Sequence, residues 1–145
     1  MLTKTVLITG ASSGFGEACA RKFAAEGHRL ILAARRTDRI ESLAEELGEQ
    51  VNVLPLTLDV RERESVDEQL TGLPAEFSVV DVLVNNAGLA LGLNLADKAD
   101  LDHWDTMVDT NIKGLMYCTR AILPGMVARG AGHVVNIGSV AASWP

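Results

Sequence analysis

Three glycines near the amino terminus, Gly10, Gly14 and Gly16, have the spacing and the surroundings of a phosphate-binding turn. They follow the run Thr5–Ile8, which predicts a short buried strand, and a helical pattern begins where the turn ends. Glycine lets the backbone approach a ligand closely, and a helix N-terminus offers free N–H groups and the positive end of its dipole. A strand, a turn and a helix in this order predict a pyrophosphate site, with a Gly/Ser surface turn as the alternative. The expected contacts are Gly10, Ala11, Ser12, Ser13, Gly14, Phe15 and Gly16.

Two arginines, Arg35 and Arg36, follow the second predicted strand, and the first acid after them is Asp38. In dinucleotide-binding folds an acid at this place binds the ribose 2′-hydroxyl of NAD, whereas an arginine accommodates the 2′-phosphate of NADP. A guanidinium group binds phosphate through paired, charge-assisted hydrogen bonds. The two arginines therefore favour NADP as the cofactor, and solvated charges at the start of a helix are the alternative.

Further polar residues end predicted strands or interrupt a helix. Asp59 ends the third strand, where it can also cap the next helix. The Asn-Asn-Ala-Gly segment, Asn85–Gly88, leaves the fourth strand at the edge where α/β folds bind ligands, although by itself it would be a turn. Asn111 lies inside a predicted helix, where asparagine is unfavourable, unless it is simply an exposed polar residue. Ser139 follows the fifth strand, and no His–Asp pair suggests a hydrolase triad.

The pattern over 9–16, Thr-Gly-x-x-x-Gly-x-Gly, resembles the signature of the classical short-chain dehydrogenases/reductases. Asp59, the Asn-Asn-Ala-Gly segment, Asn111 and Asn136–Ser139 stand at matching distances, so the resemblance covers the whole chain. It implies that Asp59 binds the adenine amino group, with the Val60 backbone beside it. The resemblance adds Asn86, Ala87 and Gly88 to the cofactor contacts.

The resemblance also implies which residues act on the substrate. Asn111 is expected to distort its helix and hold a water that contacts a catalytic lysine. Ser139 is expected to bind the substrate oxygen and stabilise its developing charge. The family's Tyr-x-x-x-Lys acid–base pair belongs on the helix after strand five, but the chain ends at Pro145. The one tyrosine, Tyr117, lies on the preceding helix with Ala121 four residues on, so it is not part of that pair.

We therefore expect residues 1–145 to be the NADP-binding Rossmann domain, the N-terminal part of a longer single-domain enzyme, and to be inactive alone. Asn85–Gly92 and Gly138–Pro145 resemble the 3-hydroxy acid dehydrogenases that oxidise L-serine and L-allo-threonine. The expected activity is NADP-dependent hydride transfer between the nicotinamide and an alcohol or ketone carbon of a small hydroxy or keto substrate. The complete protein is expected to be a homo-oligomer, a dimer or a tetramer. A non-catalytic dinucleotide-binding module and a general carbonyl or acyl-carrier ketoreductase are the alternatives.

Alternating strand and helix patterns predict the elements that hold these residues. The expected strands are 5–8, 30–33, 51–56, 79–84 and 133–137. Four helices are expected between and after these strands. The first has the apolar stripe Phe15, Cys19 and Phe23 and ends at Gly27, and the second has the stripe Ile40, Leu43, Ala44 and Leu47 and ends at Gly48. A polar helix covers 62–70, and a long helix begins at Asp102, has Trp104, Val108, Ile112 and Leu115 on one face, and is broken or kinked near its end by Pro124-Gly125. This order predicts an α/β, doubly wound parallel sheet of Rossmann type. The resemblance implies the strand order 3-2-1-4-5.

Composition limits the class of protein. A chain of 145 residues fits one domain, and a net charge of −6 argues against nucleic acid as a partner. The two cysteines form no Cys-x-x-Cys motif, which fits a reducing cytoplasm. No apolar segment approaches the length that spans a membrane. The three histidines lack the spacing of metal ligands, so no metal is expected.

Overall fold

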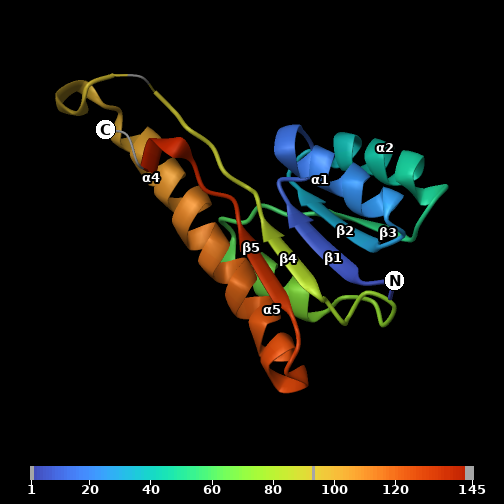
Figure 1. The fold of residues 1–145 in the computed structure, drawn as a ribbon. Coiled ribbons are helices and arrows are strands. Elements are labelled where there is room, and N and C mark those ends of the chain that lie inside the picture. Colours follow the sequence, from blue (N-terminus) through green and yellow to red (C-terminus); the bar gives the residue numbers. More distant parts are fainter. Residues whose placement is uncertain (1, 93, 143–145) are drawn as a thin grey trace.

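A computed structural model describes residues 2–92 and 94–142 of the chain. It is a five-stranded parallel sheet with helices on both faces (Figure 1). The strands are β1 (Thr5–Thr9), β2 (Arg29–Ala34), β3 (Val53–Thr57), β4 (Val82–Asn85) and β5 (His133–Asn136). The helices are α1 (Gly14–Ala25), α2 (Thr37–Gly48), α3 (Arg63–Thr71), α4 (Leu101–Val108) and α5 (Leu115–Arg129), with the π-helical η2 (Asp109–Gly114) between the last two and the short 3-10 turns η1 (Ala96–Lys98) and η3 (Val140–Ala142).

The strand order is β3-β2-β1-β4-β5, which confirms the predicted doubly wound sheet. β1 is central because Val6 pairs with Leu30 of β2 on one side and with Val82 of β4 on the other. β3 lies at one edge of the described sheet, the position at which a strand tolerates Pro55, which lacks an N–H donor. All five strands therefore end at the same edge of the sheet, with the segments that follow them gathered there.

Two apolar clusters hold the layers together, one on each face of the sheet. The first joins α1 and α2 to alternate residues of the sheet, and the second joins α3 and α5 to the other residues of the same strands. The buried α2 residues Ile40, Leu43, Ala44 and Leu47 are those that the sequence predicted. The side chains of β1, and those of β2 after Arg29, are almost without exposed surface, as expected for parallel strands covered on both faces.

Several predicted boundaries and faces were wrong. β4 begins at Val82, not at Val79. The Asp81 backbone N–H still donates to Thr5 O at 2.9 Å, and the Asp81 carboxylate accepts a hydrogen bond from the Thr5 N–H at 2.9 Å. On α1 the buried residues are Gly16, Ala20 and Ala24, while Phe15 is 77% exposed. The predicted stripe is thus one residue out of register with the face that meets the sheet. Gly27, with φ of +80°, does follow the end of α1 as predicted.

The long helical segment also differs from its prediction. Trp104, Val108 and Ile112 are between 42% and 54% exposed, whereas Cys118, Ile122 and Met126 face the sheet. Trp104 is therefore not a core residue in the described part of the chain. The helix does not end at Pro124 but continues to Arg129, where Gly130 adopts a left-handed conformation. Burial raises the pKa of the Cys118 thiol to about 12.

The described residues contain no helix that is both long and apolar enough to cross a membrane.

Candidate functional site

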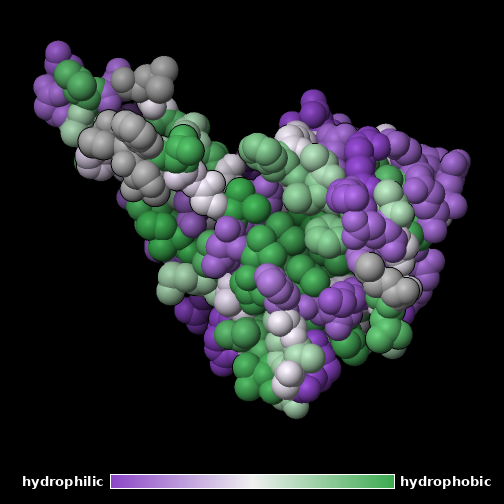
Figure 2. Space-filling view, in the orientation of Figure 1, coloured by the Kyte–Doolittle hydropathy of each residue, from purple (hydrophilic) through white to green (hydrophobic). Residues whose placement is uncertain are grey.

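A cleft of about 690 Å³ lies at the carboxyl ends of the strands, where the sequence placed its candidate residues. Figure 2 shows the hollow between the body of the molecule and the projecting segment that carries α4. The cleft is lined by Gly10, Ser12, Ser13, Phe15, Ala34, Arg35, Arg36, Leu58, Asp59, Val60, Asn85, Asn86, Ala87, Gly88, Leu89, Ala90, Thr110, Asn111, Leu115, Ile137, Gly138 and Ser139. It therefore collects residues from every strand end and from the turn before α5.

The glycine turn is packed on one side and open on the other. Gly10 has φ of +65°, and a Cβ there would lie 2.8 Å from Ala87 Cα. A Cβ on Gly16 would lie 2.4 Å from Gly10 O and 2.5 Å from Asn86 Nδ2. Gly14, with φ of +57°, has no atom within 4 Å of the place of its missing Cβ. Two glycines thus let the turn, α1 and the end of β4 approach one another, and the third leaves free space at the start of a helix, which suits an anion.

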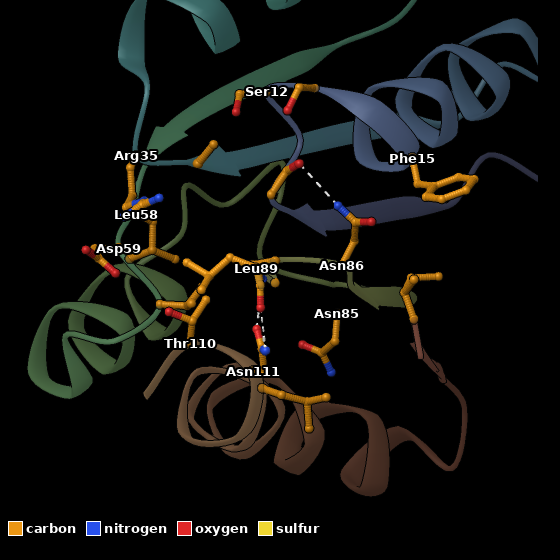
Figure 3. A pocket seen from close by; sticks show the side chains of 18 of the residues that line it. Ser12, Phe15, Arg35, Leu58, Asp59, Asn85, Asn86, Leu89, Thr110 and Asn111 are labelled. Carbon is orange, nitrogen blue, oxygen red and sulfur yellow. Dashed lines mark hydrogen bonds between the residues drawn. The ribbon is translucent and has the colours of Figure 1, made fainter. Parts of the chain in front are cut away.

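Thr9 joins the glycine turn to the end of β4. Its Oγ1 accepts hydrogen bonds from the backbone N–H groups of Asn86 (3.1 Å) and Ala87 (3.0 Å). In the other direction, the Asn86 side-chain amide donates hydrogen bonds to Thr9 O at 3.1 Å and to Gly10 O at 3.2 Å (Figure 3). Sequence reasoning did not assign this role to Thr9, because its partners lie far away in the chain.

Asn85 joins β4 to its other neighbour. Its buried side-chain amide donates to Asn136 Oδ1 of β5 at 2.9 Å and to Thr119 Oγ1 of α5 at 3.0 Å. The Asn85 Oδ1 atom is buried without a hydrogen-bond partner among the described residues. The asparagine pair therefore ties three neighbouring strand ends together beside the cleft.

Arg36 reaches from the end of β2 back to the glycine turn. Its guanidinium donates to Ser12 Oγ (Nη2 at 3.0 Å and Nε at 3.3 Å) and to Ser13 Oγ (Nη2 at 2.8 Å). Arg35 also lines the cleft. The Arg36 guanidinium and two serine hydroxyls are thus gathered at one corner, and no carboxylate follows in the sequence until Asp38. Arg35 lies on the side of Asp59, where its charge helps to lower the pKa of that carboxyl.

Asp59 lies at the end of β3 and does not cap α3. The residue at the cap position of α3 is Glu62, and the Asp59 carboxylate instead binds Arg61, with Nη2 at 2.6 Å from Oδ2. The hydrogen bond from the Arg61 guanidinium holds the pKa of the Asp59 carboxyl below its usual range. The carboxylate therefore stays ionised and forms part of the cleft wall.

Asn111 lies within the π-helical segment η2, so the helix is distorted at this residue, as predicted. Its Oδ1 accepts a hydrogen bond from Leu89 N–H at 2.9 Å and its Nδ2 donates to Leu89 O at 2.8 Å (Figure 3). The Asn111 side chain thus binds both the N–H and the C=O group of Leu89, as a neighbouring strand would in a sheet, and holds the segment after Gly88 in place. Its predicted contact with a water and a lysine remains a prediction.

Ser139 lines the cleft at the carboxyl end of β5, as expected, and its Oγ accepts a hydrogen bond from Ala141 N–H at 3.1 Å. Tyr117 lies away from the cleft and packs against the cluster on the α5 face. Among the residues predicted to contact the cofactor, Ala11 and Gly16 are buried and Gly14 is exposed, and none of the three lines the cleft. These three residues shape the turn, and their cofactor contacts remain predictions.

Several lining residues were not predicted. Leu58 and Ile137 follow β3 and β5, so their position at strand ends was a usable signal. No sequence pattern indicated the other three lining residues, because two lie in a loop and one lies inside a helix: Leu89, Ala90 and Thr110. The Thr110 hydroxyl is buried without a hydrogen-bond partner among the described residues. Those same residues hold no group of three or more His, Cys, Asp or Glu that could bind a metal ion.

Comparison with known proteins agrees with this geometry. The family model described as short chain dehydrogenase matches residues 4–145. An NADP-dependent 3-hydroxy acid dehydrogenase of Salmonella typhi is 57% identical over 140 residues, which are 97% of this chain and 56% of the relative. Sulfoacetaldehyde reductase 2 of Chromohalobacter salexigens is 52% identical over 145 residues, 99% of this chain and 58% of the relative.

Among solved structures, the closed form of a serine dehydrogenase complexed with NADP+ superimposes with a TM-score of 0.91 at 53% identity, covering 97% of this chain and 56% of that one. The chain therefore spans little more than half the length of the proteins that it matches. Sequence, fold and the residues of the cleft all lead to one assignment: the chain belongs to the short chain dehydrogenase family.

Proposed function

We propose that residues 1–145 are the NADP-binding Rossmann domain of a longer single-domain oxidoreductase. The complete enzyme would transfer a hydride between the nicotinamide and an alcohol or ketone carbon. The open space beside Gly14 at the start of α1 suits the pyrophosphate, and NADP-dependent relatives support the cofactor. The cofactor supplies the hydride acceptor or donor, while the protein binds, orients and polarises.

The preference for NADP is carried by one observation, the Arg36 guanidinium on the hydroxyls of Ser12 and Ser13. The cation at this corner comes from Arg36, which reaches it from β2. A phosphate placed there meets the Arg36 guanidinium and two hydroxyl groups, whereas the 2′-hydroxyl of NAD finds no carboxylate at that corner.

Ser139 and Asn111 are the proposed catalytic residues in the described part. The Ser139 hydroxyl stands at the end of β5, where it can donate to the substrate oxygen and stabilise the charge that develops on it. Asn111 holds the segment that forms the facing wall. The acid–base pair is proposed to lie beyond Pro145, so the 145-residue chain should bind the cofactor without turning over substrate.

The substrate class is a short alcohol or carbonyl compound with an acidic group one carbon away from the reacting carbon. One relative is named for 3-hydroxy acids and another for sulfoacetaldehyde. In both compounds a single carbon separates the acid, carboxylate or sulfonate, from the carbon that is oxidised or reduced. L-Serine and L-allo-threonine have this arrangement, and we propose them as substrates. The complete protein is proposed to act in the cytoplasm as a homo-oligomer.

The proposal is tested on the full-length protein by isothermal titration calorimetry with NADPH and NADH. We expect NADPH to bind more tightly, and Arg36→Ala to reduce the difference by about 1.5–3 kcal/mol, the range for hydrogen bonds to charged groups. Arg120→Ala removes the same charge from an exposed site on α5 and serves as the control. Equal affinity for both cofactors in the unmodified protein would contradict NADP preference. Tight NADPH binding with no oxidation of L-serine or reduction of sulfoacetaldehyde would favour the non-catalytic module.

A further inference from the structure

Two side chains that stand four residues apart on α4 and η2 hold the segment that follows β4. Asn111 binds both backbone groups of Leu89, with N···O distances of 2.9 Å to the N–H and 2.8 Å to the C=O (Figure 3). Two residues further on, the Leu91 N–H donates to Met107 Sδ at 3.3 Å. Residues four apart lie on one face of a helix, so the segment 89–91 runs along that face.

The hydrogen bonds show that this segment is extended. In a strand the N–H and C=O of one residue point to the same side, and those of the next residue point to the opposite side. Leu89 turns both groups to Asn111, and Leu91 turns its N–H to the same helical segment. Burial alternates as well, because Leu89 and Leu91 are half-buried and Ala90 between them is exposed. The Ala90 N–H therefore points away from the helix, and it has no acceptor among the residues that the structure describes.

The free N–H lies at the end of the cleft that also contains Ser139. Ala90 and Ser139 both line the cleft and follow paired strands, β4 and β5. The two arginines that line the cleft, Arg35 and Arg36, follow β2, which is separated from β5 by β1 and β4. No other Lys, Arg or His of the described residues lines it. An acidic group near Ser139 thus meets a backbone N–H on the described wall, and no cation.

We propose that the Ala90 N–H binds the acidic group of the substrate, and that Met107, acting through Leu91, is the positioning residue that keeps this N–H turned into the cleft. A backbone N–H that donates to an anionic oxygen forms a charge-assisted hydrogen bond, roughly twice as strong as one between neutral groups. The N–H would therefore favour a carboxylate or a sulfonate over an uncharged group of similar size. The inference rests on the proposed function, because it needs an acidic substrate in the cleft.

The test compares 3-hydroxypropanoate with 1-propanol as substrates of the full-length protein with NADP+. The two alcohols differ only in that the first has a carboxylate where the second has a methyl group. We expect kcat/KM to be at least about tenfold higher for the acid, the factor that one hydrogen bond to a charged group supplies. Ala90→Pro removes the N–H and should lower this ratio about tenfold, while Leu89 before it is already extended, as proline requires.

Met107 is tested by variants that keep its size. Met107→Leu removes the sulfur acceptor at nearly the same volume and should lower the ratio several-fold, through a higher KM for the acid with kcat and NADPH affinity unchanged. Met107→Gln, whose amide oxygen can accept from the Leu91 N–H, should restore the ratio. Met116→Leu makes the same change at a methionine of α5 that is 59% exposed, and it should leave the ratio unchanged.

The outcomes separate the inference from the proposed function. A ratio near one in the unmodified protein overturns the inference, and so does an Ala90→Pro variant that keeps the ratio. If Met107→Leu lowers kcat/KM equally for both alcohols, Met107 is only a structural residue and its positioning role fails. If the unmodified protein binds no NADPH or oxidises neither alcohol, the proposed function fails before the inference is reached. Met107→Leu keeps the test available should Ala90→Pro not fold.

Discussion

Gly16 shows at the scale of one residue why the first turn has its sequence. Gly10 O and the Asn86 side-chain amide occupy the space that a Cβ on Gly16 would need, and these two groups are hydrogen-bonded to each other across the turn. Any side chain would separate α1 from the end of β4. The cleft wall and the packing of α1 therefore depend on the same missing carbon atom.

Gly16→Ala should lower the free energy of unfolding by about 1–3 kcal/mol, the usual cost of overpacking, and should weaken dinucleotide binding as well. Gly48→Ala is the matched control, because Gly48 lies in α2 with no atom within 4 Å of its missing Cβ. That change should raise stability by about 0.5–1 kcal/mol, since alanine favours a helix over glycine. Urea unfolding followed by circular dichroism measures both. A neutral Gly16→Ala would show that the turn can relax.

The sequence revealed residues whose type is informative by itself, and it missed those whose role comes from a distant partner. Glycines after a strand and arginines without a neighbouring acid were enough to predict the cleft and its charge. Asp59 was considered as a helix cap, but its partner is the side chain of Arg61, and residue type could not decide between the two. The role of Thr9 depends on Asn86 at the end of another strand, so no local pattern announces it.

At the scale of elements, η2 places a wide turn between α4 and α5 where Asn111 points at the segment after β4. Periodicity predicted one continuous helix with one apolar stripe. The segment has two apolar faces, one with Cys118, Ile122 and Met126 against the sheet and one with Trp104, Val108 and Ile112 exposed. The spacing of apolar residues indicates that a helix has an apolar face, but it does not indicate whether that face packs against the sheet or against another partner.

Asn111→Ala should speed hydrogen exchange at the Leu89 amide, because that N–H loses its acceptor at 2.9 Å. Asn111→Asp keeps an oxygen at the same place and should preserve the protection, although it loses the bond to Leu89 O. NMR-detected exchange of the full-length protein distinguishes the two variants. Fast exchange at Leu89 before any substitution would mean that the clamp is not held in solution.

At the scale of the molecule, one side of the described chain is left without a cover. Trp104, Val108, Ile112, Met116 and Val127 are exposed along α4, η2 and α5, and β5 is the outer strand of the described sheet. Large apolar patches mark association sites, and outer strands recruit further strands. Either the remainder of a longer protein or another copy would bury this surface.

The isolated 145-residue chain should therefore self-associate and should not oxidise NADPH with a ketone substrate. Light scattering measures association, and absorbance at the nicotinamide band measures turnover. Met116→Glu and Val127→Glu should raise the monomer fraction, whereas Leu2→Glu, at an exposed residue before β1, should not. A monodisperse unmodified monomer would contradict the association, and NADPH-dependent reduction would contradict the inactivity.

The central place of β1 has a consequence for the order in which the chain folds. Val6 pairs with Leu30 after a short connection but with Val82 only after a much longer one. Each doubling of loop length adds only about 0.6 kcal/mol to the entropy of closure, yet distant pairings slow folding markedly. We infer that β1, β2 and β3 assemble before β4 docks. The cleft is lined both by residues that follow β1, β2 and β3 and by residues that follow β4 and β5, so a dinucleotide can bind only after β4 has docked. Once bound, the dinucleotide would hold the two groups of strands together and raise the stability of the folded state by mass action.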